Sequence, residues 1–372
     1  MQEIAEQQER RRIRKILICC RGEIAQRFIR TCKLMGIGTI AVHCPEDNAA
    51  LFVRNADRAF VLTGTMNNNK VVTDQILAIA RMNDVDALAP GYGPLAENAD
   101  FAEACHEAGF SFIGPNVESI RLMGNKAMAR EVLALHDVPI IPGGTKTVSG
   151  LDDALRLAQE IGYPVILKAA LGGGGRGIRT VINSDQLPDA LRQVRVEAAV
   201  SFGDDAIYVE KFLTGVRHVE IQVLGDKHGN IIHLGERDCS IQRKNQKIVE
   251  ESPSPAITDE VRKQLCAAAI RSASVARYDS AGTVEFLVDG NGDFYFMEMN
   301  TRIQVEHPVT EMVTGLDLVE EMIRSAEGRH LRYQQQDIHF SGHAIEFRIC
   351  SEDPCYVFLS KRLTPLKHLA VV

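Results

Sequence analysis

The sequence begins without a hydrophobic run that could serve as a secretion signal or a membrane span. A charged stretch, residues 7–15, is followed by only about five apolar residues, whereas a spanning helix needs about 20. Acidic residues at Glu3, Glu6 and Glu9 argue against a transit peptide, because such peptides are poor in acidic side chains. We therefore expect a cytoplasmic protein that does not associate with a membrane.

Excess positive charge and paired cysteine motifs are also lacking. The net charge is −7, so no basic surface dominates the chain and nucleic acid is not an expected partner. The nine cysteines show no CxxC spacing, which argues against a zinc site or a disulfide framework and indicates reduced thiols. A chain of 372 residues is long enough for about two or three domains with a large buried core.

The two common nucleotide-binding fingerprints are absent as well. The segment CCRGEIA is not a GxGxxG fingerprint, and the glycine run 172–175 lacks the Walker pattern and precedes a strand rather than a helix. Four consecutive glycines are costly in entropy, so the run needs a reason. It fits either a flexible hairpin tip or a mobile lid, and we favour a lid. Its backbone N–H groups could close on ATP phosphates beside Lys168.

From residue 15 to residue 113 the sequence alternates between strand and helix patterns. Predicted strands cover residues 15–20, 39–44 and 87–89, and predicted helices cover residues 22–36 and 73–81. This alternation predicts a parallel sheet covered by helices on both faces. The loop PGYG, residues 90–93, follows a strand and is either a structural turn or a ligand-binding loop at the carboxyl edge of that sheet.

The middle of the chain predicts a hinge followed by a small unit. A single helix over residues 117–136, which carries Lys126, leads to Pro139 and Pro142, and these prolines mark the hinge. Beyond it we predict a helix over 152–161 and strands over 165–169, 178–181 and 206–213. The glycine run lies between the first two of these strands.

Residues 283–300 predict a β-hairpin. Two β-rich apolar runs flank Asn291-Gly292, which favours a two-residue type I′ turn. A turn centred there pairs residue 290 with 293, 287 with 296, and Glu285 with Glu298. Asn300 lies on the same face as the two glutamates.

The paired carboxylates of this hairpin predict a metal site. Like charges held about 4.5–5.5 Å apart between Cβ atoms destabilise a hairpin unless a cation neutralises them. A solvated pair on the surface is the alternative. The polar run that follows, which contains Arg302 and Glu306, favours a hard cation such as Mg²⁺ or Mn²⁺ shared with nucleotide phosphates.

A polar run over residues 239–247 precedes this hairpin in the chain. Taken alone, His218 or Lys247 is more often a surface residue than a functional one, and the run itself could be a solvated loop. Its place between strands and the acidic hairpin favours a site in which an anionic substrate lies between these cations and bound metal ions.

Taken together, these segments resemble the biotin carboxylase component of biotin-dependent carboxylases, within the ATP-grasp superfamily. The matching segments run in family order from about residue 15 to residue 354: RGEIA, PGYGPLAENADFA, FIGP, MGNKAMA, GGGGRG, EKFL, RHVEIQVLGD, ERDCSIQRKNQK, GTVEFLV, MEMNTRIQVEHPVTEMVTG and GHAIEFRICSEDP. Each segment alone is weak, but their combination is specific.

The resemblance implies an α/β fold in which an N-terminal parallel α/β (pre-ATP-grasp) domain is followed by an ATP-grasp domain with a mobile glycine-rich lid. The expected boundaries are 1–113 for the N-terminal domain, 114–140 for a helical linker, 141–212 for the lid subdomain and 213–372 for the C-terminal ATP-grasp domain. After residue 354 the sequence departs from the family pattern, so we expect the family's final subdomain to be missing.

The resemblance also implies a set of site residues. ATP would be bound by Lys126, Lys168, Gly174, Gly175, Glu210, Lys211, Leu213, His218, Asn245, Glu285, Leu287 and Glu298. Two Mg²⁺ or Mn²⁺ ions would be ligated by Glu285, Glu298 and Asn300, and bicarbonate would be held by Lys247, Arg302 and Val305. Glu306 would be the base that deprotonates bicarbonate, and Arg348 would stabilise the biotin enolate.

Five residues, at three places in the chain, depart from the family pattern. Ala89 and Pro94 flank PGYG where the family has His and Phe, Asn245 replaces a ribose-side His, and Cys19-Cys20 replace Ala-Asn. Asparagine keeps an amide that can hydrogen-bond, so nucleotide contacts would be weakened rather than lost.

The expected activity is ATP- and bicarbonate-dependent carboxylation of biotin through carboxyphosphate, as the first half-reaction of an acyl-CoA carboxylase in fatty acid biosynthesis, with acetyl-CoA as the expected acceptor. Expected partners are a biotin carboxyl carrier protein, carboxyltransferase subunits, and either a second copy or a full-length subunit. The alternatives are a catalytically weak ATP-binding partner subunit and an ATP-grasp ligase for a different acid.

Overall fold

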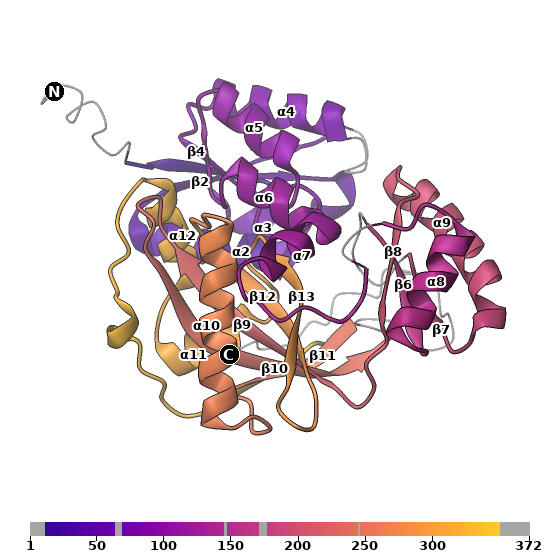
Figure 1. Ribbon diagram of the computed structural model, residues 1–372. Coiled ribbons are helices and arrows are strands. Elements are labelled where there is room, and N and C mark those ends of the chain that lie inside the picture. The colour runs from indigo at the N-terminus through magenta and orange to yellow at the C-terminus, as the bar shows by residue number, and fades with distance from the viewer. Residues whose placement is uncertain (1–11, 64–68, 145–146, 171–176, 245, 350–372) are drawn as a thin grey trace, which may run out of the picture.

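The computed structural model describes residues 12–63, 69–144, 147–170, 177–244 and 246–349 (Figure 1). Within these ranges the strands form a five-stranded, a three-stranded and a six-stranded sheet. The first sheet is parallel and the other two are antiparallel. The α/β class with an N-terminal parallel sheet is therefore confirmed, whereas the predicted domain boundaries stay predictions.

The parallel sheet has the strand order β3-β2-β1-β4-β5. Its strands are β1 (Lys15–Ile18), β2 (Gly38–His43), β3 (Arg58–Val61), β4 (Ala87–Ala89) and β5 (Ser111–Phe112). Its helices are α2 (Gly22–Met35), η1 (Pro45–Asp47), α3 (Leu51–Asn55), α4 (Asn69–Met82) and α5 (Ala99–Glu107). Ile16 and Ile18 of β1 share a core cluster with Phe28 of α2, whereas Leu17 shares another with Ile76 of α4. Because alternate residues of a strand face opposite sides, the sheet is covered on both faces as predicted.

Two helices, rather than the single helix predicted over 117–136, connect this sheet to the rest of the chain. They are α6 (Val117–Gly124) and α7 (Lys126–Ala134). Asn125 between them is extended (φ −94°, ψ 97°), and its side-chain oxygen accepts a hydrogen bond from the Met128 N–H. Asparagine is a strong N-cap residue, so it starts a new helix here. Lys126 is consequently the first residue of α7.

The three-stranded sheet has the order β7-β6-β8 and lies with its helices to one side of the molecule (Figure 1). Its elements are α8 (Leu151–Ile161), β6 (Val165–Ala169), β7 (Ile178–Val181), η2 (Ser184–Gln186), α9 (Leu187–Phe202) and β8 (Ile207–Lys211). Leu167 and Val209 of the sheet pack in one core cluster with Ala158 of α8 and Val194 of α9. The glycine run that we predicted to be a lid lies outside the described residues.

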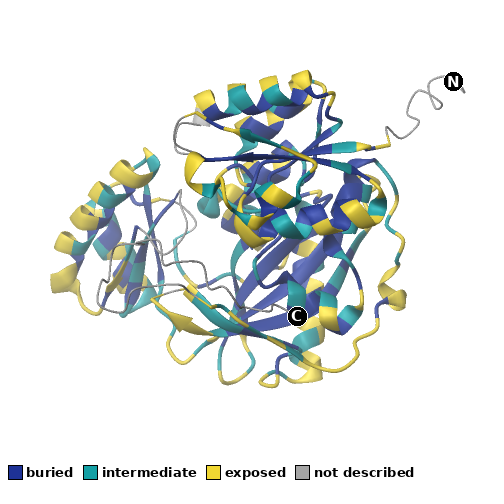
Figure 2. Cartoon of the chain, turned by 180° about the vertical axis from the view of Figure 1, so that it is seen from behind, coloured by how far each residue is buried: buried dark blue, intermediate teal, exposed yellow. Residues whose placement is uncertain are grey.

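The six-stranded sheet has the order β13-β12-β9-β10-β11-β14. Its strands are β9 (Arg217–Gly225), β10 (Ile231–Arg243), β11 (Gln246–Ser252), β12 (Ala281–Val288), β13 (Phe294–Asn300) and β14 (Ala344–Phe347). The helices that follow β11 are α10 (Asp259–Val275), α11 (His307–Thr314), α12 (Leu318–Ala326) and η3 (Gln335–Asp337). Ile221, Val284 and Phe286 pack against Leu265 and Ala269 of α10, and the central strands β9 and β12 are largely buried (Figure 2). The opposite face of the central strands carries the polar residues.

The described residues at the two ends of the polar run 239–247 belong to paired strands rather than to a loop between strands. Strand β10 continues to Arg243, β11 begins at Gln246, and Gln242 pairs with Lys247. Lys247 is therefore a strand residue, and the sheet fixes the direction of its side chain.

The turn of the acidic hairpin differs from the predicted type I′ turn at Asn291-Gly292. The Asp289 N–H donates to the Asp293 carbonyl oxygen (2.9 Å), so the three residues 290–292 connect β12 and β13. Of these three, Gly292 is the residue with positive φ (90°). A type I′ turn needs positive φ at both central residues, whereas a three-residue loop needs it at one.

A second irregularity restores the predicted pair of carboxylates. The three-residue loop makes Leu287 face Tyr295, so the predicted pairing of residue 287 with 296 is wrong. A register shift next to Glu285 then adds one residue to β13, as a β-bulge does. Glu285 therefore faces Glu298 as predicted, because the two deviations cancel.

Two further findings concern the cysteines and the possibility of a membrane-spanning helix. The cysteines in the described ranges are buried free thiols: Cys19, Cys20, Cys32, Cys44, Cys105, Cys239 and Cys266. Among the helices of these ranges, none combines the length and the apolar character needed to cross a bilayer.

Gly225 at the end of β9 offers a test of this packing. A Cβ atom at this position would lie 2.1 Å from the backbone oxygen of Tyr278, which cannot move aside as a side chain could. We expect Gly225→Ala to lower the free energy of unfolding by about 1–3 kcal/mol in urea titrations.

Gly38→Ala is the matched control, because a Cβ there would have its nearest neighbours at 3.6 and 3.7 Å. Its effect should stay within about 0.5 kcal/mol. Equal effects of the two substitutions would contradict the close approach at Gly225.

Candidate functional site

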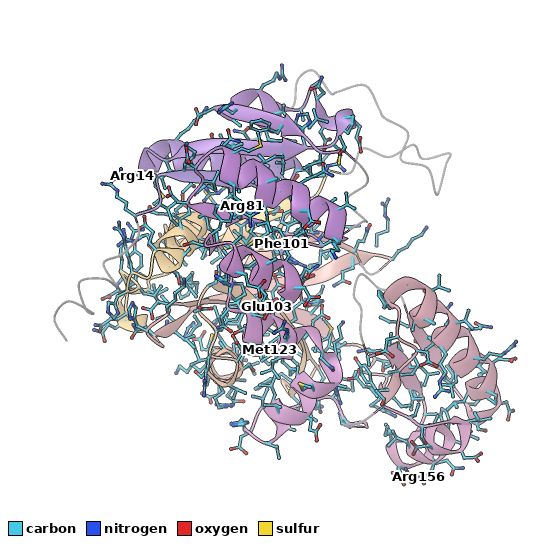
Figure 3. The ribbon with its side chains drawn as sticks, turned by 90° about the horizontal axis from the view of Figure 1, so that it is seen from above. Arg14, Arg81, Phe101, Glu103, Met123 and Arg156 are labelled. Atoms are coloured by element: carbon cyan, nitrogen blue, oxygen red, sulfur yellow. The ribbon has the colours of Figure 1, made fainter. Side chains whose placement is uncertain are left out.

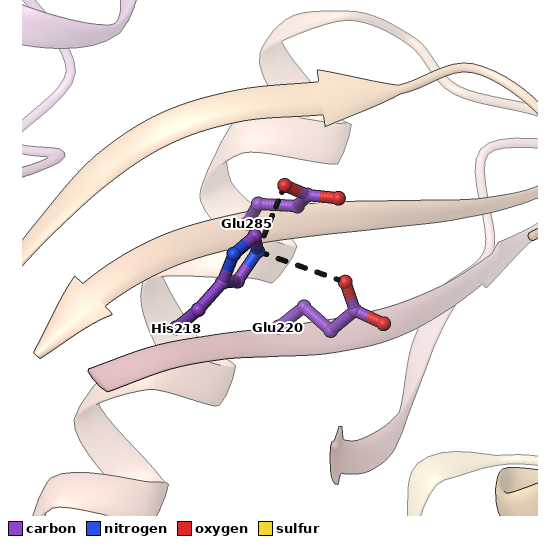
Figure 4. Close-up of side chains that lie close together, drawn as sticks. All are labelled: His218, Glu220 and Glu285. Atoms are coloured by element: carbon purple, nitrogen blue, oxygen red, sulfur yellow. Dashed lines mark ion pairs between the residues drawn. The ribbon is translucent and has the colours of Figure 1, made fainter. Parts of the chain in front are cut away.

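The polar face of the six-stranded sheet begins with β9 and β12. His218 and Glu220 of β9 lie opposite Leu287 and Glu285 of β12, so all four share one face. His218 Nε2 lies 2.9 Å from Glu285 Oε2 and 4.0 Å from Glu220 Oε2 (Figure 4). Burial alone would lower the pKa of His218, but the Glu285 carboxylate outweighs burial and raises the pKa above its usual value.

Arg237 of β10 pairs with Glu220 across the two strands, so it lies on the same face, and it is fully buried. Its guanidinium donates five hydrogen bonds: Nε to Glu220 Oε1 (2.6 Å), Nη1 to Gln222 Oε1 (2.7 Å) and Thr310 Oγ1 (2.9 Å), and Nη2 to Thr283 Oγ1 (3.0 Å) and Gln304 Oε1 (2.8 Å). Five is the full donor capacity of an arginine. Arg237 thus joins β9, β12, the turn after β13 and α11 into one rigid network.

Lys247 of β11 joins three carboxylates. Its Nζ lies 2.8 Å from Glu285 Oε1 and 2.8 Å from Glu306 Oε1, and it also donates to Glu220 Oε2. Burial opposes the charge on Lys247, but the three carboxylates raise its pKa well above the usual value. The ammonium group is therefore positively charged and uses all three of its donors.

Glu306 lies immediately before α11 and is 2% exposed. Its Oε1 accepts from Lys247, and its Oε2 accepts from Arg348 Nη2 at 2.7 Å. Burial would raise the pKa of Glu306, but Lys247, Arg237 and Arg348 outweigh burial and lower the pKa to about 2. This carboxylate is thus ionised at neutral pH and lies between two cations.

Arg302 and Val305 are the other two residues predicted to hold bicarbonate. Arg302 Nη2 donates to Asn300 Oδ1 (3.1 Å), and its Nε lies 3.1 Å from Glu97 Oε1, which is contributed by the N-terminal part of the chain. Val305 is half-buried in the turn before Glu306. The structure therefore brings Lys247, Glu306 and Arg348 into direct contact, whereas Arg302 pairs with neighbouring groups.

The two lysines predicted to contact phosphates are each paired with a carboxylate. Lys126, at the start of α7, donates to Glu298 Oε2. Lys168 Nζ lies 2.6 Å from Glu210 Oε2, and Arg130 of α7 donates to the other oxygen of that carboxylate. Glu210 is 1% exposed, so its charge is offset by two cations in the interior.

The remaining predicted nucleotide contacts lie at the end of β8 and on β12. Lys211 Nζ donates to the carbonyl oxygens of Gly162 (2.9 Å) and Tyr163 (3.2 Å). Leu213 and Leu287 are half-buried. Gly174, Gly175 and Asn245 lie outside the described residues.

The oxygen ligands predicted for a metal are close together and fit a hard cation. Glu285 faces Glu298, and Glu285 Oε1 accepts from Asn300 Nδ2 (2.8 Å) and Gln304 Nε2 (2.8 Å) as well as from Lys247. Carboxylate and amide oxygens are ligands that Mg²⁺ and Mn²⁺ prefer. Lys126 is paired with Glu298, and Lys247 is paired with Glu285. A metal ion would therefore compete with these two lysines for the carboxylate oxygens.

The sequence analysis did not single out five residues of this network: Glu97, Arg130, Glu220, Arg237 and Gln304. One of them carried a usable signal, because Glu220 alternates with His218 in β9 and strand periodicity places both on one face. The partners of Arg237 come from four segments, so its burial could be found only in the folded chain.

Comparisons with known proteins show which families and chains this sequence is similar to. A family model described as "Biotin carboxylase, N-terminal domain" matches residues 12–120, and one described as "Carbamoyl-phosphate synthase L chain, ATP binding domain" matches residues 125–334. "Biotin carboxylase 1" of Bacillus subtilis is 50% identical over 349 residues, which are 93% of this chain and 78% of that protein. The chloroplastic biotin carboxylase of Arabidopsis thaliana is 52% identical over 91% of this chain, which spans 64% of that protein.

A solved structure shows the same fold. The biotin carboxylase domain dimer of Hydrogenobacter thermophilus 2-oxoglutarate carboxylase, in complex with MgADP, ADP and bicarbonate, superimposes with a TM-score of 0.89. It is 48% identical, and the match covers 93% of this chain and 76% of that chain.

Removing the buried guanidinium tests whether Arg237 supports the network. Arg237→Met leaves Glu220 with less compensating charge and leaves Gln222 and Gln304 without a donor. We expect the free energy of unfolding to fall by about 3–5 kcal/mol in urea titrations.

The control is Arg156→Met on the outer side of α8 (Figure 3), where the side chain is 63% exposed and pairs with Asp153 and Glu160. Exposed pairs contribute little to stability, so no measurable change is expected. A loss at Arg237 no larger than that at Arg156 would contradict the proposed support.

The low pKa of Glu306 predicts a specific acid dependence. A carboxyl group whose pKa is lower in the folded state stabilises the fold above its unfolded pKa of about 4.3, and the contribution is lost as pH falls towards 2. A ¹³C NMR titration should show Glu306 still ionised at pH 4.

In Lys247→Met the largest of the three opposing charges is gone, so the measured pKa of Glu306 should rise. An unchanged titration in that variant would rule out Lys247 as the main cause.

Proposed function

Because the chain belongs to the biotin carboxylase family, we propose that it carboxylates biotin on a carrier protein, using ATP and bicarbonate. The observation that carries the proposal is the direct contact of Glu306 with Lys247 and Arg348. A buried base between two cations suits a reaction in which an anion binds, loses a proton and attacks a phosphoryl group.

In the first step, an oxygen of bicarbonate attacks the γ-phosphorus of ATP. The bond from the γ-phosphorus to its bridging oxygen breaks, ADP leaves, and Glu306 takes the bicarbonate proton. Lys126 and Lys168 would move from their carboxylate partners to the phosphate oxygens, because developing phosphoryl charge attracts them more strongly than a carboxylate does.

The pKa of Glu306 would change as bicarbonate binds. At about 2 the carboxylate is ionised but is a weak base. A bicarbonate ion among Lys247, Arg302 and Arg348 would draw Lys247 and Arg348 away from Glu306. Burial, which raises the pKa, would then dominate, and the carboxylate would become a stronger base.

In the second step, carboxyphosphate releases CO₂ and phosphate. The phosphate removes the proton from biotin N1, and N1 forms a bond to the carbon of CO₂. Arg348 would stabilise the enolate of biotin through its guanidinium, since it already lies beside Glu306.

Metal ions would be held by Glu285, Glu298 and Asn300, whose oxygens lie on one face of the β12–β13 hairpin. Bound there, Mg²⁺ or Mn²⁺ would offset the negative charge of the phosphates. The ligand set agrees with the proposal because all the donors are oxygens. Glu210, Lys211, Leu213, His218 and Leu287 would surround the nucleoside of ATP.

For the second half-reaction we propose acetyl-CoA as the acceptor, served through a biotin carboxyl carrier protein and carboxyltransferase subunits. A dimer with a second copy or a full-length subunit is part of the same proposal. The 2-oxoglutarate carboxylase among the similar structures represents an alternative acceptor, 2-oxoglutarate.

Bicarbonate-dependent ATP hydrolysis with Mg²⁺ tests the proposed activity. Free biotin should stimulate the wild-type rate, and Glu306→Gln should lower the stimulated rate by about 10²–10⁴-fold because the base is lost.

Glu131→Gln, an exposed change on α7, serves as the control and should keep the wild-type rate. Wild-type protein that binds ATP but shows no turnover would contradict the proposal and support a catalytically weak partner subunit.

A further inference from the structure

A pair of carboxyl groups, Glu250 and Glu346, lies beside Arg348. Glu250 of β11 and Glu346 of β14 are direct neighbours across the antiparallel pair of strands. The backbone N–H of Arg348 donates to the Ile248 carbonyl oxygen (2.9 Å). Arg348 therefore continues the same ladder of backbone hydrogen bonds just beyond the end of β14. Neither carboxyl group belongs to the residues of the proposed reaction.

Glu250 is paired with Arg348 and is fully buried. Its Oε1 lies 2.6 Å from Arg348 Nε, while Arg348 Nη2 lies 2.7 Å from Glu306 Oε2. In the described part of the chain, neither oxygen of Glu250 accepts a hydrogen bond of good geometry. The guanidinium is therefore what offsets the buried charge of Glu250.

We propose that Glu250 is a positioning residue for Arg348, which holds the Nε edge of the guanidinium so that its Nη edge stays directed at the biotin site. This inference rests on the proposed function. It concerns a residue that makes no contact with the reacting groups and acts only through Arg348.

Arg348 needs such support because of its place in the fold. It follows a four-residue strand, β14, at the edge of the six-stranded sheet. An arginine side chain has many rotamers, so fixing it in one of them costs conformational entropy. When substrate draws Nη2 away from Glu306, the contact with Glu250 is the one that keeps the guanidinium in place.

The charge balance around Glu250 agrees with this role. Burial, together with the nearby Glu250 and Glu306, raises the pKa of Glu346 to about 8, although Arg348 acts in the opposite direction. At neutral pH Glu346 is therefore largely protonated and adds little negative charge. Burial also raises the pKa of Glu250, and the Arg348 guanidinium is the main group that acts against burial.

The first test compares two glutamates of β11 in the full chain. Glu250→Gln removes the charge under Arg348. Glu251→Gln is the matched control, since Glu251 is the next residue on the strand and pairs with His343 instead (3.1 Å). Loss of a charge-assisted contact predicts a rise in the KM for biotin of about tenfold in Glu250→Gln, with the KM for ATP unchanged.

In the control, both KM values should equal those of the wild type. Equal biotin KM values in the two variants would overturn the inference. So would a loss in Glu250→Gln that affects the KM for ATP and the KM for biotin alike, because that pattern indicates a general structural defect.

A second test needs neither turnover nor a folded variant. The Nε–H of Arg348 should exchange slowly with solvent in a ¹⁵N NMR experiment on the wild-type chain, because Glu250 covers it. Fast exchange would overturn the inference whatever the activity. Slow exchange without any biotin-stimulated turnover would instead preserve the placement of Arg348 and contradict the proposed function.

Discussion

The site depends on the burial of charge at the polar face of the six-stranded sheet. Glu220 is fully buried, and an isolated carboxylate in the interior is very costly. Arg237 and Lys247 each contact a different oxygen of Glu220, so its charge is offset on both sides. Arg237 then fixes Gln304, and Lys247 reaches Glu285 and Glu306. The positions of the groups that we propose to be catalytic follow from the need to neutralise one buried carboxylate.

The same network explains how the site could respond to anionic substrates. Each of four cations is paired with a carboxylate: Lys126 with Glu298, Lys168 with Glu210, Lys247 with Glu285 and Glu306, and Arg348 with Glu306 and Glu250. Binding of ATP, metal and bicarbonate would therefore be an exchange of partners, in which cations move to the substrate and carboxylates become available to metal and proton. Little new charge needs to be desolvated, because the groups are already buried and oriented.

Much of this site follows from strand periodicity. The pairing of Glu285 with Glu298 was predictable because alternate residues share a face, although the turn itself was predicted wrongly. The loop is one residue longer than an Asn-Gly turn suggests, and the bulge next to Glu285 compensates for it. A bulge depends on how β12 is held by its other neighbour, β9, and local sequence does not reveal that.

Other features required tertiary contacts. The start of a new helix at Lys126 had a local signal in Asn125, which the prediction of one continuous helix overlooked. Arg237 and Glu250 had none, because a charged residue in a strand is usually exposed. Their burial arises only when distant segments supply partners, such as Thr310 for Arg237 and Arg348 for Glu250.

The central claim is that bicarbonate bound beside Lys247 and Glu306 attacks the γ-phosphate of ATP. Its most direct test is turnover with ¹⁸O-labelled bicarbonate in unlabelled water, followed by mass analysis of the released phosphate. If bicarbonate is the nucleophile, each phosphate carries one ¹⁸O atom, because the attacking oxygen stays on phosphorus when carboxyphosphate releases CO₂. Phosphate without label would show that water attacks ATP instead and would contradict the account.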